Sequence, residues 1–190
     1  MANISTNIAF IRKIQQQNGM TFIEVLIALV IIVTGILGAV AMQATAKQGS
    51  FDAMQRSLAS SLAEDIISRM RTNSNTLLAL GAYNGVDYGG NNYPEPGERC
   101  VISTAACNVA TLRANDQFEW EQALMGGNVT IAGENAGGLV GATGCINVVA
   151  NAVTVVVNWQ GKQGMMDAQQ AVCGLAGTQR RQVIVQVFII

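Results

Sequence analysis

The sequence predicts an α+β fold in which one long N-terminal helix packs on a C-terminal antiparallel β-sheet. Three observations carry this prediction. An uninterrupted apolar segment lies near the N-terminus, a stretch with helical apolar spacing follows it, and valine- and isoleucine-rich runs with alternating character close the chain. These patterns divide the chain into residues 1–19, a polar leader, residues 20–71, the helix, and residues 72–190, a globular domain.

The apolar half of the predicted helix, residues 20–42, is long enough to cross a membrane. Val25 to Met42 is interrupted only by Thr34 and two glycines, and a helix of this length spans the hydrocarbon core of a bilayer. Arg12 and Lys13 precede the segment, so the positive-inside rule keeps the N-terminus in the cytoplasm and places the following domain in the periplasm.

The second half of the predicted helix is amphipathic. Its apolar residues recur every three or four positions and form a stripe for packing against the globular domain: Phe51, Met54, Leu58, Leu62, Ile66 and Met70. Asp65 and Arg69 are four residues apart in the order that favours a helical ion pair.

Residues 72–140 are expected to connect helix and sheet. Their first part, to about residue 108, carries all three tyrosines and both prolines and is expected to be irregular. A short helix should follow, with Asp116 as its N-cap, Glu119 completing a capping box, and Trp120 and Leu124 on one face. The glycines from 126 to 144 lack the phosphate-loop pattern and indicate a flexible connection.

Residues 141–190 are expected to form the sheet. The predicted strands are residues 144–149, residues 153–159 after a tight turn at Ala150-Asn151-Ala152, and residues 183–190. Val153, Val155, Val157 and Trp159 alternate with Thr154, Val156 and Asn158, and runs of this kind suit a sheet with one face on the amphipathic helix.

Composition excludes several classes of function. The chain has no histidine, which removes histidine-based catalytic pairs and histidine metal sites, and no other catalytic constellation is visible. We therefore expect no enzyme, no cofactor and no metal, although backbone carbonyls could build a calcium site that sequence hides. The 11 basic and 12 acidic residues form no basic patch, so we expect no nucleic-acid binding.

The four cysteines, Cys100, Cys107, Cys145 and Cys173, all follow the apolar segment, in the part expected to reach an oxidising compartment. No CxxC occurs, so neither a zinc ribbon nor a redox pair is indicated. Three pairings are possible. Cys100–Cys107 and Cys145–Cys173 are favoured because each joins residues of one local region, and free buried cysteines remain the alternative.

The junction before the apolar segment is the most specific motif. Gly19-Met20-Thr21-Phe22-Ile23-Glu24 ends a polar leader at a glycine and places one carboxylate near the start of the apolar run. It resembles the prepilin-peptidase recognition sequence of type IV pilins and type II secretion pseudopilins. The resemblance implies cleavage after Gly19, N-methylation of Met20, and a role for Glu24 in meeting the amine of a neighbouring subunit during assembly.

Two other interpretations of this region stay open. Ala39-Val40-Ala41 resembles an ordinary signal-peptidase site, and Glu24 could simply lie at the cytoplasmic interface of the membrane.

The resemblance extends to the PilV-type minor pilins, on the helix from Leu58 to Asn73, the cysteine pair, the Trp-bearing helix and the strand ending in Asn158-Trp159. It implies a subunit of the inner membrane and then of the pilus at the cell surface, which primes assembly near the filament tip and serves adhesion and twitching motility. The implied partners are prepilin peptidase, other minor pilins, the major pilin and a tip adhesin. The alternatives are a minor pseudopilin and a ligand-binding adhesin using Tyr83, Tyr88 and Tyr93.

Overall fold

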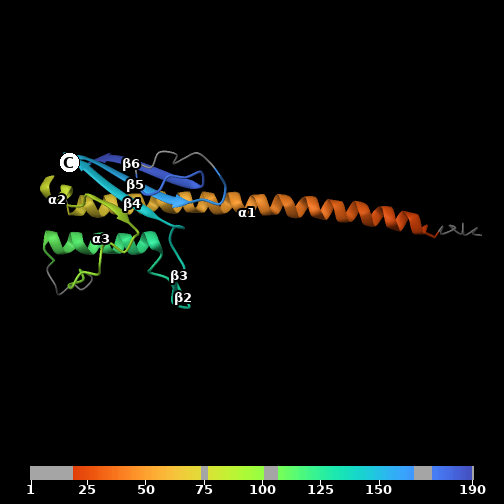
Figure 1. The fold of residues 1–190 in the computed structure, drawn as a ribbon, viewed down its shortest axis with the longest axis horizontal. Coiled ribbons are helices and arrows are strands. Elements are labelled where there is room, and N and C mark those ends of the chain that lie inside the picture. Colours follow the sequence, from red (N-terminus) through yellow and green to blue (C-terminus); the bar gives the residue numbers. More distant parts are fainter. Residues whose placement is uncertain (1–18, 74–76, 101–106, 165–172, 190) are drawn as a thin grey trace, which may run out of the picture. The chain divides into compact units, whose positions relative to one another are not determined.

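The computed structural model describes residues 19–73, 77–100, 107–164 and 173–189. It confirms the α+β fold: a long N-terminal helix packs through its C-terminal half on an antiparallel β-sheet (Figure 1). The chain divides into two compact units, residues 1–44 and residues 45–190, and each is described by itself.

Helix α1, Phe22–Thr72, belongs to the first unit as far as Ala44 and to the second from Thr45. In the first unit its apolar side chains are exposed, and this is the helix that is long and apolar enough to cross a membrane among the residues described. Helical length and composition alone support that assignment.

In the second unit α1 buries one face in the core. Leu62, Ile66 and Met70 of the predicted stripe are buried, together with Ala59 and Ala63. Met54 is instead 57% exposed, so the first turns of the predicted stripe contribute little to the core. The alanines had no place in the predicted stripe, because their small side chains carry a weak apolar signal.

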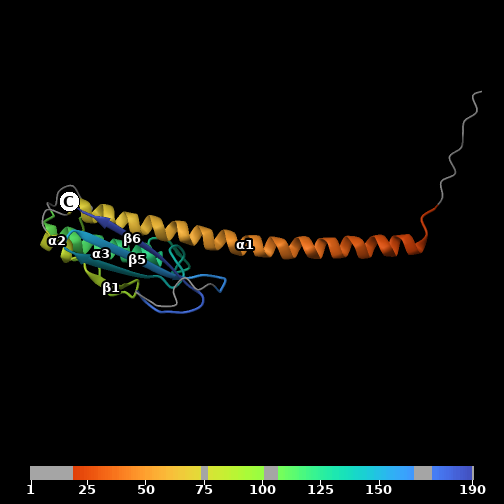
Figure 2. The ribbon, with the colours of Figure 1, turned by 90° about the horizontal axis from the view of Figure 1, so that it is seen from above.

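The sheet has four strands in the order β1-β4-β5-β6, all antiparallel: β1, Gly85–Tyr88; β4, Thr143–Val149; β5, Ala152–Gln160; and β6, Arg180–Phe188. Strands β1 and β6 form its edges (Figure 2). Val149 pairs with Ala152, so a two-residue turn with Ala150 at φ 53° joins β4 to β5. The three C-terminal strands agree with the prediction within three residues at the ends that the structure describes; Ile190 lies outside the described residues.

The segment expected to be irregular contains helix α2, Leu77–Gly81, and strand β1. Strand β1 has no apolar alternation, and its pairing with β4 is interrupted by an irregularity between Gly85 and Tyr88, with Asp87 at φ 62°. Its strand geometry depends on hydrogen bonding to β4, which lies more than fifty residues away in the sequence. Local pattern could not predict it.

Helix α3, Val109–Met125, is longer than predicted and begins elsewhere. The prediction of Asp116 as N-cap is wrong: Asn108 caps the helix, and its side-chain oxygen accepts the backbone N–H groups of Ala110 and Thr111 at 2.9 Å. Asp116 lies in the helix interior and is buried. Residues 109–115 show little amphipathic pattern, which is why the sequence suggested a later start.

The glycine-rich segment after α3 is an ordered hairpin. Strands β2, Thr130–Ile131, and β3, Glu134–Asn135, pair with each other, and Leu139 donates its N–H to the carbonyl of Leu124 at 3.0 Å. Gly126 ends α3 in the left-handed conformation at φ 73°, where a Cβ would collide with the Gly137 carbonyl. The glycines therefore permit close backbone packing in this segment.

Candidate processing and assembly site

The start of α1 carries a capping arrangement built from Thr21 and Glu24. Thr21 immediately precedes the first helical residue, and the Glu24 carboxylate accepts the Thr21 backbone N–H at 2.9 Å and its hydroxyl at 3.0 Å. Thr-x-x-Glu is the sequence of a capping box, in which the acidic residue satisfies an N–H that the helix leaves unpaired. Glu24 thus has a hydrogen-bonding role within its own chain.

The residues of the predicted cleavage junction are accessible. Gly19 and Met20 are exposed, with Met20 at 79%, and both precede the helix. An exposed, non-helical peptide bond is the form that a peptidase can bind in an extended conformation. The apolar residues that follow are exposed as well, from Phe22 to Met42, which is the surface expected of a helix that faces lipid or other helices.

In the globular unit, α3 is joined to α1 by a network of ion pairs. Arg69 of α1 contacts Asp65 at 2.9 Å, Glu119 at 2.6 Å and Asp116 at 3.4 Å, and Arg99 contacts Glu119 at 3.0 Å. The sequence predicts the Asp65–Arg69 pair. The contacts to α3 depend on packing between elements some fifty residues apart and have no sequence signal.

The titration of this network follows from burial and charge. Burial raises the pKa of Glu119, but hydrogen bonds from Arg69 and Arg99 outweigh it and leave the pKa below its usual value. Burial raises the pKa of Asp116 above its usual value, although the Tyr83 hydroxyl donates to it at 2.6 Å. Burial also raises the pKa of Tyr83, which keeps this phenol protonated as the donor.

Glu121 of α3 holds the loop after β1 in place. It was not among the residues predicted from the sequence to be functional. Its fully buried carboxylate accepts the backbone N–H groups of Gly89 at 3.0 Å, Asn92 at 3.0 Å and Tyr93 at 2.9 Å. A buried carboxylate needs several donors, and here the loop supplies them. Glu121 follows Trp120 in α3, and nothing in its local sequence marks it as buried.

The tyrosines do not form an exposed groove. Tyr83 and Tyr88 are fully buried, and Tyr93 stacks on Tyr88 with ring centroids 3.8 Å apart. Burial raises the pKa of Tyr88, whose hydroxyl donates to the Tyr83 carbonyl at 3.0 Å. Tyr83 and Tyr88 are therefore inaccessible to a ligand, and Tyr93 is half-buried with Tyr88 stacked on its ring, so the three rings give little support to the alternative of a ligand-binding adhesin.

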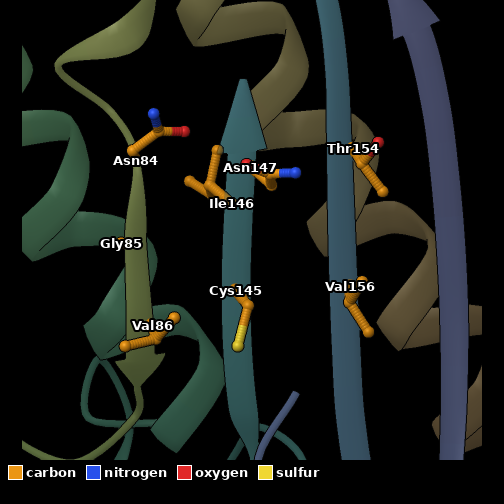
Figure 3. Close-up of a pocket in the computed structure, with 8 residues that line it drawn as sticks. All are labelled: Asn84, Gly85, Val86, Cys145, Ile146, Asn147, Thr154 and Val156. Atoms are coloured by element: carbon orange, nitrogen blue, oxygen red, sulfur yellow. The ribbon is translucent and has the colours of Figure 1, made fainter. Parts of the chain in front are cut away.

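The outer face of the sheet carries a pocket of about 440 Å³. Figure 3 shows its lining on three neighbouring strands, with Val86 on β1, Cys145 on β4 and Val156 on β5. Its other lining side chains are asparagines, threonine and isoleucine, and it includes no acid, base or free nucleophile. The lining alone does not point to a reaction.

The structure joins Cys100 to Cys107 and Cys145 to Cys173, the pairing favoured from the sequence, with Cα atoms 6.0 Å and 5.8 Å apart. Among the described residues no cysteine is free. Cys145 and Cys173 are buried with Val156 on the sheet face opposite the main core. This disulfide covers Val156 on the outer face, whereas its neighbours Val155 and Val157 are buried in the main core on the inner face.

The comparison with known families concerns the N-terminus. Residues 14–40 match the model of the prokaryotic N-terminal methylation motif. This motif indicates a prepilin of the type IV pilin or pseudopilin kind and suggests a structural subunit rather than an enzyme. No curated protein and no solved structure matches the chain.

The methylation motif and the exposed apolar helix agree with each other. A prepilin of this kind is processed by prepilin peptidase and assembles with other pilins, and an exposed apolar helix fits anchoring in a membrane before assembly.

Proposed function

We propose that the chain is a minor pilin of a type IV pilus, of the PilV type, which primes filament assembly near the tip. The match of residues 14–40 to the methylation motif carries this proposal. The residues of the PilV resemblance support it: Trp120 lies at the contact of α3 with α1, and Trp159 lies on the inner face of the sheet. The proposed partners are prepilin peptidase, other minor pilins, the major pilin and a tip adhesin.

In this proposal the peptidase cuts between Gly19 and Met20 in the inner membrane, and the new amine of Met20 is methylated. The apolar helix stays in the mature subunit and holds it in the membrane with its C-terminal domain in the periplasm. During assembly Glu24 pairs with the Met20 amine of a neighbouring subunit, because a carboxylate in an apolar environment needs an opposite charge.

Mass spectrometry of the mature N-terminus tests the processing. The expected chain begins at N-methylated Met20, and Gly19→Leu should leave the precursor uncut in the membrane because the scissile position accepts only a small side chain. Gly49→Leu is the matched control, since Gly49 lies on an exposed helical surface with space for a side chain. A mature chain beginning at Met42 would instead assign the cut to ordinary signal peptidase.

The runner-up is a minor pseudopilin of a type II secretion system, which shares the methylation motif. Fractionation separates the two functions. A minor pilin should occur in sheared, purified pili, and its deletion should reduce the number of pili per cell while their width stays the same. Loss of protein secretion with normal piliation would assign the chain to the secretion system.

A further inference from the structure

A second pocket lies within the globular unit, where the α1 residues around Asp52 meet the end of β5 and the start of β6. Its volume is about 240 Å³, and its lining includes Asp52, Arg56, Trp159, Gln163 and Arg181. Unlike the pocket on the outer sheet face, it is lined by charged groups of both signs. Neither the methylation motif nor the proposed pilus function assigns it a role.

Two buried donors in this pocket have no acceptor among the residues that the structure describes. They are Nε1 of Trp159, a residue 1% exposed, and Nη1 of Arg181, a residue 4% exposed. The two residues are direct partners across β5 and β6, so their side chains lie next to each other on the inner face of the sheet. Buried donors are nearly always hydrogen-bonded, and an unpaired one calls for an unseen partner.

The Asp52 carboxylate and the Gln163 backbone carbonyl, two acceptors beside the pocket, already have donors. Asp52 accepts the Lys162 backbone N–H at 3.0 Å through Oδ1, and its Oδ2 lies 3.5 Å from Arg181 Nη2. The same Nη2 donates to the Gln163 carbonyl at 2.9 Å. Both contacts of the Arg181 guanidinium are made by Nη2, and Nη1 has no acceptor among the described residues.

The charges of the pocket favour a negative ligand. Two guanidinium groups, of Arg56 and Arg181, line it with the single carboxylate of Asp52. The Lys162 ammonium lies nearby, 5.5 Å from the centre of the Phe51 ring. A ligand that satisfies both unpaired donors must present acceptor atoms, and the guanidinium charge of Arg181 at one of them favours a ligand that is anionic.

We propose that this pocket binds a phosphate-type oxyanion through Trp159 Nε1 and Arg181 Nη1. A guanidinium matches the spacing of phosphate oxygens and forms strong charge-assisted hydrogen bonds with them. Free phosphate and the phosphate of a lipid headgroup share this chemistry. The choice of a lipid headgroup depends on the membrane anchoring in the proposed function, because the α1 residues that line the pocket begin at Gly49, shortly after the apolar run ends at Met42. Binding of free phosphate does not depend on the proposed function.

The chain contains two tryptophans, which gives the experiment an internal control. The full chain, labelled with ¹⁵N in its indole groups and held in a phosphate-free maltoside detergent, is titrated with inorganic phosphate at constant ionic strength. The Trp159 indole N–H signal should shift saturably. The Trp120 signal should stay in place, because its N–H already donates to the Leu62 carbonyl at 2.8 Å.

Two matched variants test the guanidinium. Arg181→Gln should weaken phosphate binding at least tenfold. Arg180→Gln, the same charge change on the adjacent residue, should alter it less than twofold because Arg180 is not among the residues that line this pocket and its Nη1 donates to the Gly141 carbonyl. If Arg181→Gln does not fold, Trp159→Phe keeps an aromatic ring and removes the N–H. Calorimetry should then show a several-fold loss of phosphate affinity.

Lipid nanodiscs distinguish a lipid headgroup from free phosphate as the source of the oxyanion. A Trp159 shift in phosphatidylglycerol nanodiscs that is missing in nanodiscs of a phosphate-free galactolipid assigns a headgroup, and a response to inorganic phosphate alone assigns free phosphate. No saturable shift with either probe, equal shifts at both indoles, or tighter binding of acetate than of phosphate would overturn the proposal. These results do not depend on cleavage or pilus assembly, so they are separate from the test of the proposed function.

Discussion

Trp120 of α3 donates its indole N–H to the backbone carbonyl of Leu62 in α1, at 2.8 Å. The same ring lies against β4 at Gly144, where a Cβ would approach the indole to 2.6 Å. Trp120 also contacts Tyr88 edge-to-face, with centroids 4.8 Å apart. One side chain therefore connects helices α1 and α3 with strands β1 and β4 of the sheet, and the stability of the globular unit depends on it.

Trp120→Phe should destabilise the globular unit. It keeps an aromatic ring but removes the N–H, so the Leu62 carbonyl keeps only its partner within helix α1, and a cavity opens beside Gly144. Loss of the hydrogen bond costs about 0.5–1.5 kcal/mol, and the cavity adds to it. Denaturant unfolding followed by circular dichroism measures the change. Phe118→Leu, on the same helix, is the control and should cost less; equal costs would show that the hydrogen bond is unimportant.

Glu121→Gln should loosen the loop after β1. An amide presents one acceptor oxygen and an NH₂ group, so at least one of the three backbone N–H groups of Gly89, Asn92 and Tyr93 loses its acceptor. We expect a loss of about 2 kcal/mol and faster amide hydrogen exchange at these residues. Glu64→Gln, on an exposed face of α1, makes the same chemical change without that effect. Unchanged exchange would mean that the carboxylate does not hold the loop.

Glu119 should contribute stability that depends on pH. Its folded pKa lies below its unfolded value, so the contribution is present above the unfolded pKa and is lost as pH falls through the folded pKa. Glu119→Gln should therefore destabilise the protein at pH 7 by roughly 1 kcal/mol and be nearly neutral once the wild-type carboxyl is protonated. Unfolding curves from pH 7 to pH 2.5 measure this, and a difference that is independent of pH would contradict it.

Cys145→Ser should lower stability more than Cys100→Ser. The cysteines are 28 residues apart in one disulfide and 7 in the other, and the chain-entropy model assigns these loops about 3–4 and about 2 kcal/mol. The longer loop also joins β4 to the segment before β6. Thermal unfolding of the two variants, each with its partner cysteine also replaced by serine, compares them; equal losses would defeat the prediction.

Glu24→Gln separates the charge of Glu24 from its capping role. Glutamine also serves in a capping box, so the helix start should persist while the charge is lost. We expect normal insertion and cleavage but fewer pili per cell, counted by electron microscopy, with the processed fraction read from gel mobility. Thr21→Val, which removes the hydroxyl donor to Glu24 and keeps its charge, should assemble normally. Processed Glu24→Gln protein that restores normal pilus numbers would sink the charge-pairing proposal.

The sequence by itself predicted those parts of the molecule whose cause is local. Repeated apolar patterns indicate which face of an element is buried. They predicted the apolar run, the helical stripe at Leu62, Ile66 and Met70, and the inner face of β5 at Val153, Val155 and Val157. The motif at Gly19 and Glu24 is also local, and the match of residues 14–40 to the N-terminal methylation motif agrees with it, while cleavage after Gly19 stays a prediction.

Only the tertiary structure decided the rest, because its cause is contact between distant residues. Asp116 has the residue type of an N-cap, yet packing places it inside α3 beside Tyr83, while Asn108 begins the helix. Strand β1 exists through its pairing with β4. Glu121 is buried because a loop about thirty residues earlier supplies three donors. The unpaired donors of Trp159 and Arg181 become visible only once β5, β6 and α1 are assembled.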